Sequence, residues 1–189
     1  NMVFLGIMAV ICIVGMVSGF GKMSYLEKAF DRAAEDIEDS FNGIDAREGE
    51  ALGLPEELFE NEALERRYQE FHSYIEKSQS GIGDIEDYIN ESEIDGIIGK
   101  RMLEMIPDVL TSLGILGTFI GLVFGLKNFE PSNYEAMTAS VSSLVNGIKV
   151  AFLTSIYGLS LSMVFSYNTK SAYGDLMKSC YHFLDKFHS

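Results

Sequence analysis

Three long runs of apolar residues dominate the pattern of hydrophobic and polar positions along this chain. They cover residues 2–20, 109–126 and 150–167, and none of them contains a charged side chain. Each run holds 18 or 19 residues, which is about 27 Å as an α-helix and close to the thickness of the hydrocarbon core of a bilayer. Three such runs in 189 residues argue against a soluble protein. They predict an all-α integral membrane protein with three transmembrane helices.

The first run, residues 2–20, has a second interpretation as a signal peptide. It is longer than a usual signal-peptide core and lacks a small-x-small cleavage site. We therefore expect a membrane span that continues as a helix through residues 21–42. Apolar residues recur there at helical spacing: Leu26, Phe30, Ala33 and Ile37.

The region between the first two spans, residues 21–106, is predicted to be helical and exposed to water. Pro55, followed by two glutamates, suits the first position of a helix. One face of that helix is apolar: Leu64, Tyr68, Phe71 and Ile75. Ser92 and Asp95 resemble a capping box for a further helix that leads to Arg101. After the third span, an apolar face predicts one more helix: Tyr173, Leu176, Met177 and Cys180.

Basic residues near the ends of the spans orient the chain. Lys and Arg flank both ends of region 21–106 and follow residue 169, whereas the connection at 127–146 holds a single lysine, Lys127. Because basic flanks stay in the cytoplasm, we expect the N-terminus and the connection outside. The acidic region and the C-terminus are then inside. The predicted organisation is three transmembrane helices at 1–20, 107–126 and 147–168, with a cytoplasmic C-terminal helix at 169–189.

The negative charge of the chain belongs to one region. Residues 21–106 hold 23 acidic and 9 basic side chains, and the rest of the chain holds 5 of each. A region this acidic argues against nucleic acid and anionic lipid as partners. Its carboxylates lack EF-hand spacing, and the three histidines and two cysteines match no common metal site or disulfide. We expect no metal, no cofactor and no enzyme active site.

Small residues form a stripe on each of the last two spans. Gly117, Gly121 and Gly125 form consecutive GxxxG steps, with Gly114 close to the same face. Such a stripe lets another helix approach closely, so that van der Waals packing drives association in lipid. The third span carries a matching stripe: Gly147, Ala151, Ser155, Gly158, Ser162 and Ser166. We expect these stripes to form helix-packing or oligomer interfaces, with Pro107 in a structural role.

Hydroxyl groups share these faces. Thr111 and Thr118 lie seven residues apart on the second span, and Thr154 and Ser155 are adjacent on the third. In one interpretation they only pack and bond back to the carbonyl four residues earlier. In the other they line an ion path, because a hydroxyl can bind water or a partly dehydrated cation. None of the three apolar runs contains an acidic residue, so a conducting protein needs a titratable group from a second subunit.

The sequence of the hairpin resembles a known family. Residues 114–121, G-I-L-G-T-F-I-G, resemble the G-x-x-G-T-x-x-G signature of the MotA/TolQ/ExbB proton-channel family. Residues 147–159 are similar to its G-I-x-x-A-x-x-x-T-x-x-G-L segment. The three-span arrangement resembles TolQ and ExbB more than four-span MotA. Within the family, residues 145–158 look closest to the ZorA motor subunits of Zorya anti-phage systems.

This resemblance implies an ion-conducting motor subunit in the cytoplasmic (inner) membrane of a bacterium. It implies a homopentamer around two transmembrane helices of a MotB/ExbD/ZorB-like single-span partner, which supplies a membrane aspartate. The flow of H⁺ or Na⁺ would turn one component within the other. Carried over by position, Thr118 matches the pathway threonine of the family. Ser155 stands where the third-span threonine is usual, and it keeps the hydroxyl but lacks the methyl group.

The residues themselves leave a second function open. A non-conducting membrane scaffold or sensor that oligomerises through the glycine-rich hairpin explains the glycine stripes equally well. The aligned hydroxyls on both spans favour the motor. Neither interpretation says whether the ion is H⁺ or Na⁺, nor whether the motor drives defence, uptake, envelope maintenance or motility.

Overall fold

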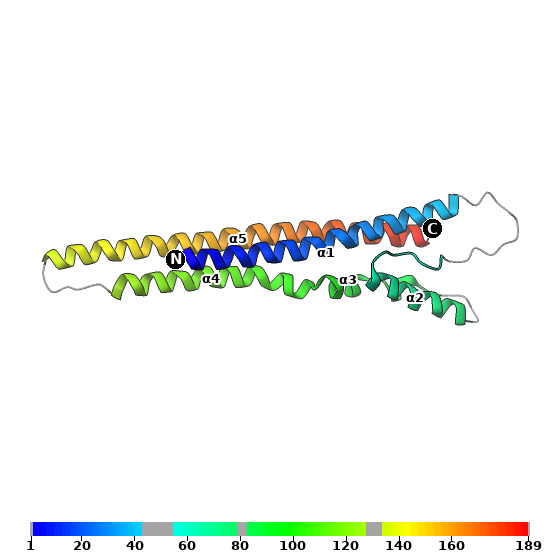
Figure 1. Cartoon of the computed structure of the whole chain (residues 1–189), viewed down its shortest axis with the longest axis horizontal. Helices are drawn as coiled ribbons and strands as arrows, with labels where there is room; N and C mark the ends of the chain where they lie inside the picture. Colours follow the sequence, from blue (N-terminus) through cyan, green and yellow to red (C-terminus); the bar gives the residue numbers. More distant parts are fainter. Residues whose placement is uncertain (1, 43–54, 79–82, 128–133, 189) are drawn as a thin grey trace. The chain divides into compact units, whose positions relative to one another are not determined.

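Helices make up most of the structure. The computed structural model describes residues 2–42, 55–78, 83–127 and 134–188. Along the chain these form α1 (Met2–Asn42), α2 (Glu62–Lys77), the short 3-10 helix η1 (Ile85–Asp87), α3 (Glu91–Ile98), α4 (Lys100–Lys127) and α5 (Tyr134–His188) (Figure 1). No strand occurs among these residues. The predicted all-α class is therefore confirmed.

Three of the described helices are long and apolar enough to cross a membrane, judged by length and composition: α1, α4 and α5. Their outer faces expose large apolar side chains, including Val17, Phe119, Val123, Phe152 and Met163. So much exposed apolar surface is unfavourable in water. Such helix faces are typical of contacts with lipid or with the apolar surface of another protein. The three apolar runs of the sequence thus correspond to three helices of membrane-spanning character.

The chain folds into two compact units. The first, here called the hairpin unit, comprises Asn1–Ser18 and Arg101–Thr169. The second, called the acidic unit, comprises Gly19–Lys100 and Lys170–Ser189. α1 and α5 are continuous helices that contribute residues to both.

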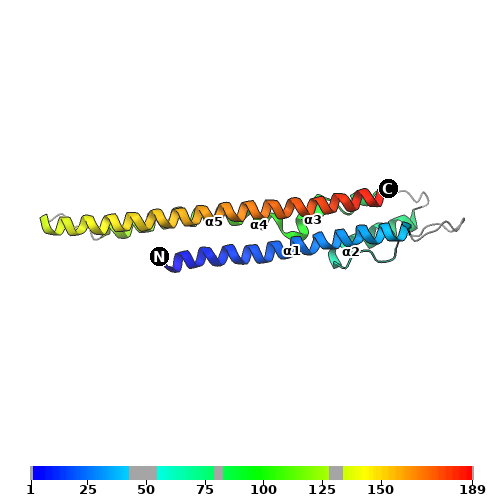
Figure 2. The same ribbon diagram turned by 90° about the horizontal axis from the view of Figure 1, so that it is seen from above.

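In the hairpin unit, α4 and α5 run antiparallel, and the first part of α1 packs beside them (Figures 1 and 2). α1 approaches closely at Gly15. A β-carbon there would lie 2.5 Å from Cδ1 of Ile106 and 2.9 Å from Cε2 of Phe165. α1 therefore packs against both arms of the hairpin, and Phe165 is fully buried in this contact.

Two helices of this unit extend beyond the membrane spans predicted from the sequence. α4 begins at Lys100, so Pro107 lies inside the helix rather than at its start. α5 begins at Tyr134, and the connection expected at 127–146 is therefore helical from that residue onward. No glycine or proline lies between residues 134 and 146, so nothing in the local sequence ends the helix there. Residues 128–133 lie outside the described part of the chain.

Aromatic side chains fill the centre of the acidic unit. Phe30 of α1 and Phe183 of α5 are fully buried, with their ring centroids 5.7 Å apart. Phe59 stands 5.1 Å from Phe183, in an edge-on arrangement. Tyr68 of α2 is also fully buried, and its hydroxyl donates to the carbonyl of Pro55 at 2.6 Å. Burial raises the pKa of Tyr68 to about 12.

The helix faces predicted for this unit are largely the buried ones. α1 buries Leu26, Phe30, Ala33 and Ile37, α2 buries Leu64, Tyr68 and Phe71, and α5 buries Leu176, Met177 and Cys180. Burial raises the pKa of the Cys180 thiol to about 12. The helical periodicity of the sequence is thus confirmed at these positions.

The predicted start of α2 is wrong. The helix begins at Glu62 and not at Pro55. The side chain of Asn61 caps it by accepting hydrogen bonds from the backbone N–H groups of Ala63 and Leu64 at 3.0 and 3.1 Å. Asparagine is among the strongest N-cap residues, because its side chain accepts hydrogen bonds from the free N–H groups of the first turn. A proline at the first helical position has no side-chain acceptor for these groups.

The predicted cap of α3 is also wrong. Asn90, rather than Ser92, accepts the hydrogen bond of a first-turn N–H group, that of Glu93, at 3.2 Å. The helix does not continue to Arg101, because Gly99 adopts a left-handed conformation with φ of 68°. Glycine reaches that region without steric cost. α4 then starts at the next residue.

Candidate functional site

The glycines of α4 face the small residues of α5 within the same chain. A β-carbon on Gly158 would lie 2.9 Å from Cα of Gly114, and one on Gly147 would lie 2.8 Å from Cα of Gly125. Real β-carbons do not approach a backbone so closely, so only glycine fits at these positions. The two helices therefore approach backbone to backbone along the stretch from Gly114 to Gly125 of α4.

The centre of this contact is equally tight. A β-carbon on Gly121 would lie 2.9 Å from Cβ of Ala151. One on Gly117 would lie 2.5 Å from Cγ2 of Thr154 and 3.1 Å from Cε1 of Phe4. The stripes predicted for helix packing or an oligomer interface thus meet each other inside one chain, and Phe4 of α1 reaches the same place.

Thr118 lies half-buried at this contact. Its hydroxyl is 3.2 Å from the carbonyl oxygen of Gly114, one turn earlier, and 3.3 Å from that of Ala151 on α5. A hydroxyl has one proton and two lone pairs. Because both neighbours are acceptors, the proton is directed at the backbone and the lone pairs remain able to bind water or a cation.

The two adjacent hydroxyl residues of α5 differ in environment. Thr154 is only 4% exposed, and it donates to the carbonyl of Val150 at 2.9 Å. Ser155 is half-buried, and its carbonyl oxygen lies on the path of α4, 3.3 Å from where a β-carbon of Gly114 would stand. The hydroxyl of Thr154 is thus buried and bonded to its own helix, whereas Ser155 is partly exposed.

A second polar contact joins the helices near Pro107. Thr111 donates to the hydroxyl of Ser162 at 3.0 Å, and Ser162 donates to the carbonyl of Pro107 at 3.0 Å. Proline inside a helix removes the hydrogen bond that its N–H would donate to the carbonyl four residues earlier, here that of Leu103. Ser162 donates instead to the carbonyl of Pro107 itself, so this contact joins the two helices beside the break without replacing the lost bond. The sequence identified all three residues, but it placed Ser162 with the packing stripe and gave no sign of this chain of hydrogen bonds.

All the predicted site residues lie in the hairpin unit, and the helix contact brings most of them together. Thr118 and Ser155 lie on facing helices, and no hydrogen bond joins their two hydroxyl groups to each other. Carboxylates flank the contact instead of entering it. Those of the described part of this unit are Glu104, Asp108 and Glu135.

A polar cluster in the acidic unit was missed by the sequence interpretation. The hydroxyl of Tyr173 lies 2.7 Å from Asp95 and 3.0 Å from Glu91, and the ammonium group of Lys100 lies 4.1 Å from the centre of the tyrosine ring. Burial and the two carboxylates raise the pKa of Tyr173. The helical pattern had assigned Tyr173 to an apolar face, and only the folded positions of α3 and α5 reveal its polar partners.

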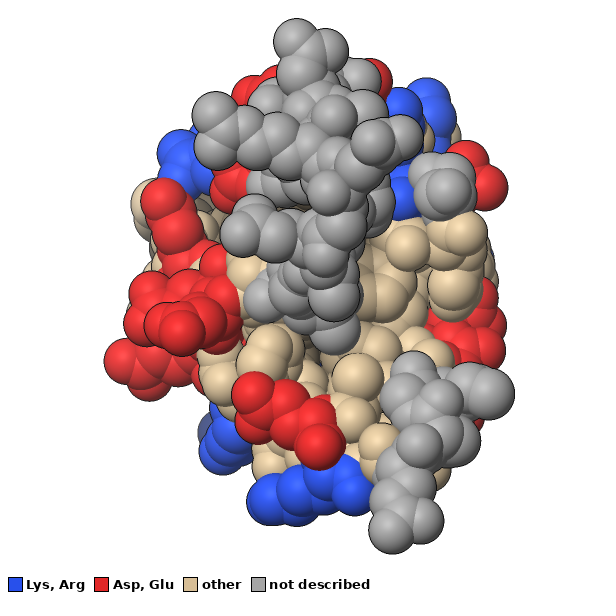
Figure 3. All heavy atoms as spheres, turned by 90° about the vertical axis from the view of Figure 1, so that its right-hand side faces the viewer, with Lys and Arg blue, Asp and Glu red and all other residues tan. Residues whose placement is uncertain are grey.

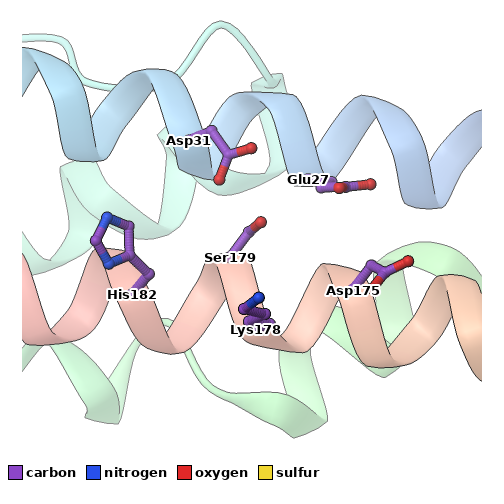
Figure 4. A pocket seen from close by; sticks show the side chains of 6 residues that line it. All are labelled: Glu27, Asp31, Asp175, Lys178, Ser179 and His182. Carbon is purple, nitrogen blue, oxygen red and sulfur yellow. The ribbon is translucent and has the colours of Figure 1, made fainter.

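The surface of the acidic unit carries carboxylates in separate patches (Figure 3). Between α1 and α5 lies an open cleft of about 280 Å³, whose lining is mixed in charge (Figure 4): Glu27, Asp31, Asp175, Lys178, Ser179 and His182. Within the described ranges, no group of three or more His, Cys, Asp or Glu residues is placed to hold a metal ion. The hairpin therefore remains the strongest candidate for a functional site.

The fold and the site define an integral membrane protein with three candidate spans, two of which form a glycine-packed hairpin carrying hydroxyl groups. Residues 2–189 match the family described as anti-phage protein ZorA of the Zorya type I system. The chain belongs to this family.

Two curated relatives agree with the family. The chain is 29% identical to the Zorya protein ZorA of Escherichia coli O139:H28 over 196 aligned residues, which cover 93% of this chain and 26% of that protein. It is 42% identical to the Zorya protein ZorA of the Crooks strain of Escherichia coli over 69 residues, covering 36% of this chain and 12% of that protein. The chain thus spans about a quarter or less of the length of these relatives.

Proposed function

We propose that this chain is the ion-conducting motor subunit of a Zorya anti-phage complex. The observation that carries the proposal is the environment of Thr118. Its proton is directed at the carbonyls of Gly114 and Ala151, so its oxygen can accept a hydrogen bond from water or coordinate a cation. Ser155, level with it on α5, supplies a second hydroxyl that no described residue engages.

The conducting complex needs a second subunit. None of the three apolar runs contains an acidic residue, although carriers of H⁺ or Na⁺ in membranes generally use a carboxylate or a continuous chain of water. We therefore assign the membrane carboxylate to a MotB/ExbD/ZorB-like single-span partner. Several copies of this chain, five by resemblance to the MotA/TolQ/ExbB family, surround a dimer of that partner.

The proposed setting is the bacterial inner membrane, with the N-terminus outside and the C-terminus inside. Basic flanks on the acidic region and after the third span support this orientation. The ion is H⁺ or Na⁺, and its flow turns one component within the other. The family description points to anti-phage defence as the process that the rotation serves.

The glycine contacts bear on the alternative of a non-conducting scaffold or sensor. In that alternative, the glycine stripe holds separate copies together. In the structure the same glycines contact α5 of their own chain. We infer that the glycine stripe holds α4 and α5 rigidly together and so positions Thr118 and Ser155. Contacts between copies of the chain are then made by the exposed apolar faces of the hairpin unit.

The test is cytoplasmic pH in cells that co-express the full-length protein with the single-span protein encoded beside it. We expect acidification with the wild type and none with Thr118→Val, because valine keeps the shape and removes the hydroxyl. Thr138→Val is the matched control, since this exposed hydroxyl donates only to the carbonyl of Tyr134 on its own helix. If no acidification occurs, the same comparison is repeated with a sodium indicator. Normal conduction by Thr118→Val would leave this threonine a packing residue and favour the scaffold.

A further inference from the structure

The hydroxyl groups of the hairpin form layers that repeat every seven residues. Thr118 on α4 lies level with Ser155 on α5, and Thr111 is hydrogen-bonded to Ser162. The register follows from the glycine contacts, which pair Gly114 with Gly158 and Gly125 with Gly147. Because the helices are antiparallel, seven residues back along α4 correspond to seven residues forward along α5. Each of these two layers has one hydroxyl from each helix, and the two stand about 10 Å apart.

The next layer in this repeat is formed by Glu104 and Thr169. Glu104 precedes Thr111 by seven residues, and Thr169 follows Ser162 by seven. Both belong to the hairpin unit. Seven residues rotate an α-helix by only about 20° from the starting face, so Glu104 stays close to the face that carries Thr111 and Thr118. It is exposed, whereas the two threonines are half-buried.

Thr169 differs from the other described threonines of this unit. Thr118, Thr138 and Thr154 each donate to the carbonyl four residues earlier. The hydroxyl oxygen of Thr169 is buried and has no hydrogen-bond partner among the described residues. Buried hydroxyls in folded proteins are nearly always paired. This hydroxyl is therefore placed to bind water or a cation at the level of Glu104.

We propose that Glu104, level with Thr169 in the third layer, is the carboxylate that exchanges the cation between the hydroxyl layers and the aqueous phase. The inference rests on the proposed conducting function of Thr118 and Ser155. For a proton, hydronium gives its proton to the carboxylate and leaves as water. The carboxylic acid then releases that proton to solvent, which restores the carboxylate. For sodium, the carboxylate oxygen replaces water in the coordination shell of the ion.

Asp108 offers a matched comparison. It carries the same charge on the same helix, one turn nearer to Thr111. It is rotated by about 60° from Thr111, however, and stands level with the buried Phe165 instead of a hydroxyl residue. If conduction needs only negative charge at this end of α4, removal of either carboxylate should lower the ion flux. If conduction needs a carboxylate in the third layer, only the removal of Glu104 should lower it.

The test uses the full-length protein co-purified with its single-span subunit and reconstituted in liposomes with an imposed H⁺ or Na⁺ gradient. Flux is compared for Glu104→Gln, Glu104→Asp, Asp108→Asn and Thr118→Val, with the size of each complex checked by gel filtration. We expect Glu104→Gln to lower the flux by about tenfold or more. Glu104→Asp, which keeps the carboxylate, and Asp108→Asn should stay within about threefold of the wild type. The gradient that drives the flux identifies the ion.

The outcomes separate this inference from the function on which it rests. Loss of flux in Thr118→Val with normal flux in Glu104→Gln overturns the role of Glu104 alone, as does an equal loss in Asp108→Asn. No flux in the wild type, or normal flux in Thr118→Val, overturns both. If Glu104→Gln does not assemble, Thr169→Val tests the same layer, and unchanged flux in that variant contradicts the proposal.

Discussion

Gly147 lies so close to Gly125 that a β-carbon on Gly147 would stand 2.8 Å from the α-carbon of its partner. The hairpin is therefore held by backbone-to-backbone contact, and its register cannot shift without placing a side chain against a backbone. Ser155 follows Gly147 by eight residues on α5, and Thr118 precedes Gly125 by seven on α4. The glycines thus fix the relative position of the two hydroxyl groups proposed to bind the ion.

Enlarging a glycine of this contact should destabilise the protein. A β-carbon on Gly158 would meet Cα of Gly114 and the carbonyl oxygen of Leu110, both at 2.9 Å, and neither backbone atom can move aside. We expect Gly158→Leu to cost at least about 1–3 kcal/mol, the usual cost of overpacking. The measurement is thermal unfolding in detergent. Gly6→Leu is the control, because a β-carbon there has no neighbour within 4 Å. Equal melting temperatures for the two variants would contradict the packing described.

The two neighbouring hydroxyls of α5 should separate in function. Thr154→Val keeps the packing against Gly117 and removes a hydroxyl that bonds only to the carbonyl of Val150. Ser155→Ala removes a hydroxyl that is half-buried and engaged by no described side chain. Ion flux through the reconstituted complex should stay within about threefold for Thr154→Val and fall by about tenfold or more for Ser155→Ala. The reverse order would mean that Thr154 binds the ion.

The tyrosine cluster of the acidic unit should contribute to stability. Tyr173→Phe removes the donor that lies 2.7 Å from Asp95 and 3.0 Å from Glu91. Lys100, 3.3 Å from Asp95 and 3.9 Å from Glu91, still offsets their negative charge, so we expect the loss of about one hydrogen bond, about 1 kcal/mol. Tyr181→Phe, at an exposed position of the same helix, should change little. Denaturant unfolding measures the free energy of unfolding of both variants. An equal loss of stability in Tyr181→Phe would show that the tyrosine cluster does not cause the loss in Tyr173→Phe.

One ion pair gives the acidic unit a pH dependence of known sign. A hydrogen bond and charge attraction from Lys186, whose ammonium group lies 2.8 Å from Glu38, lower the pKa of that carboxyl. A carboxyl with a lowered pKa in the folded state stabilises above its unfolded pKa, and that contribution is lost as the pH falls through the folded value. The melting temperature of Lys186→Met should therefore lie slightly below that of the wild type at pH 7, and the gap should close in acid. A gap that persists in acid would point to lost packing instead.

Much of the helical architecture follows from the sequence alone. The apolar runs at 2–20, 109–126 and 150–167 correspond to helices, because a helix satisfies the backbone groups of a single segment within itself, as an apolar environment requires. Buried faces such as Leu64, Tyr68 and Phe71 follow from helical periodicity. Helix starts are harder to predict, because several residues near each start can cap. Asn61 and Asn90 prevail over Pro55 and Ser92, and all four are acceptable in isolation.

The site shows a different limit. Glycine stripes predict that a helix approaches closely, but the same physics applies whether that helix belongs to the same chain or to another copy. Only the fold pairs Gly121 with Ala151 inside the chain. Thr154 and Ser155 are adjacent in the sequence, and their environments diverge because neighbouring residues of a helix point about 100° apart. Which of them meets α4 depends on the rotation of α5, and this rotation is set by packing.

The central claim is that the hydroxyl of Thr118 lies on the ion path. The most direct measurement is ion flux through liposomes containing the full-length protein and its single-span subunit, with Thr118→Ser and Thr118→Val compared with the wild type. Serine keeps the hydroxyl and valine keeps the shape. The account predicts that serine retains most of the flux and that valine abolishes it, while both complexes elute at the same size. Flux in Thr118→Val equal to that of the wild type would contradict the account.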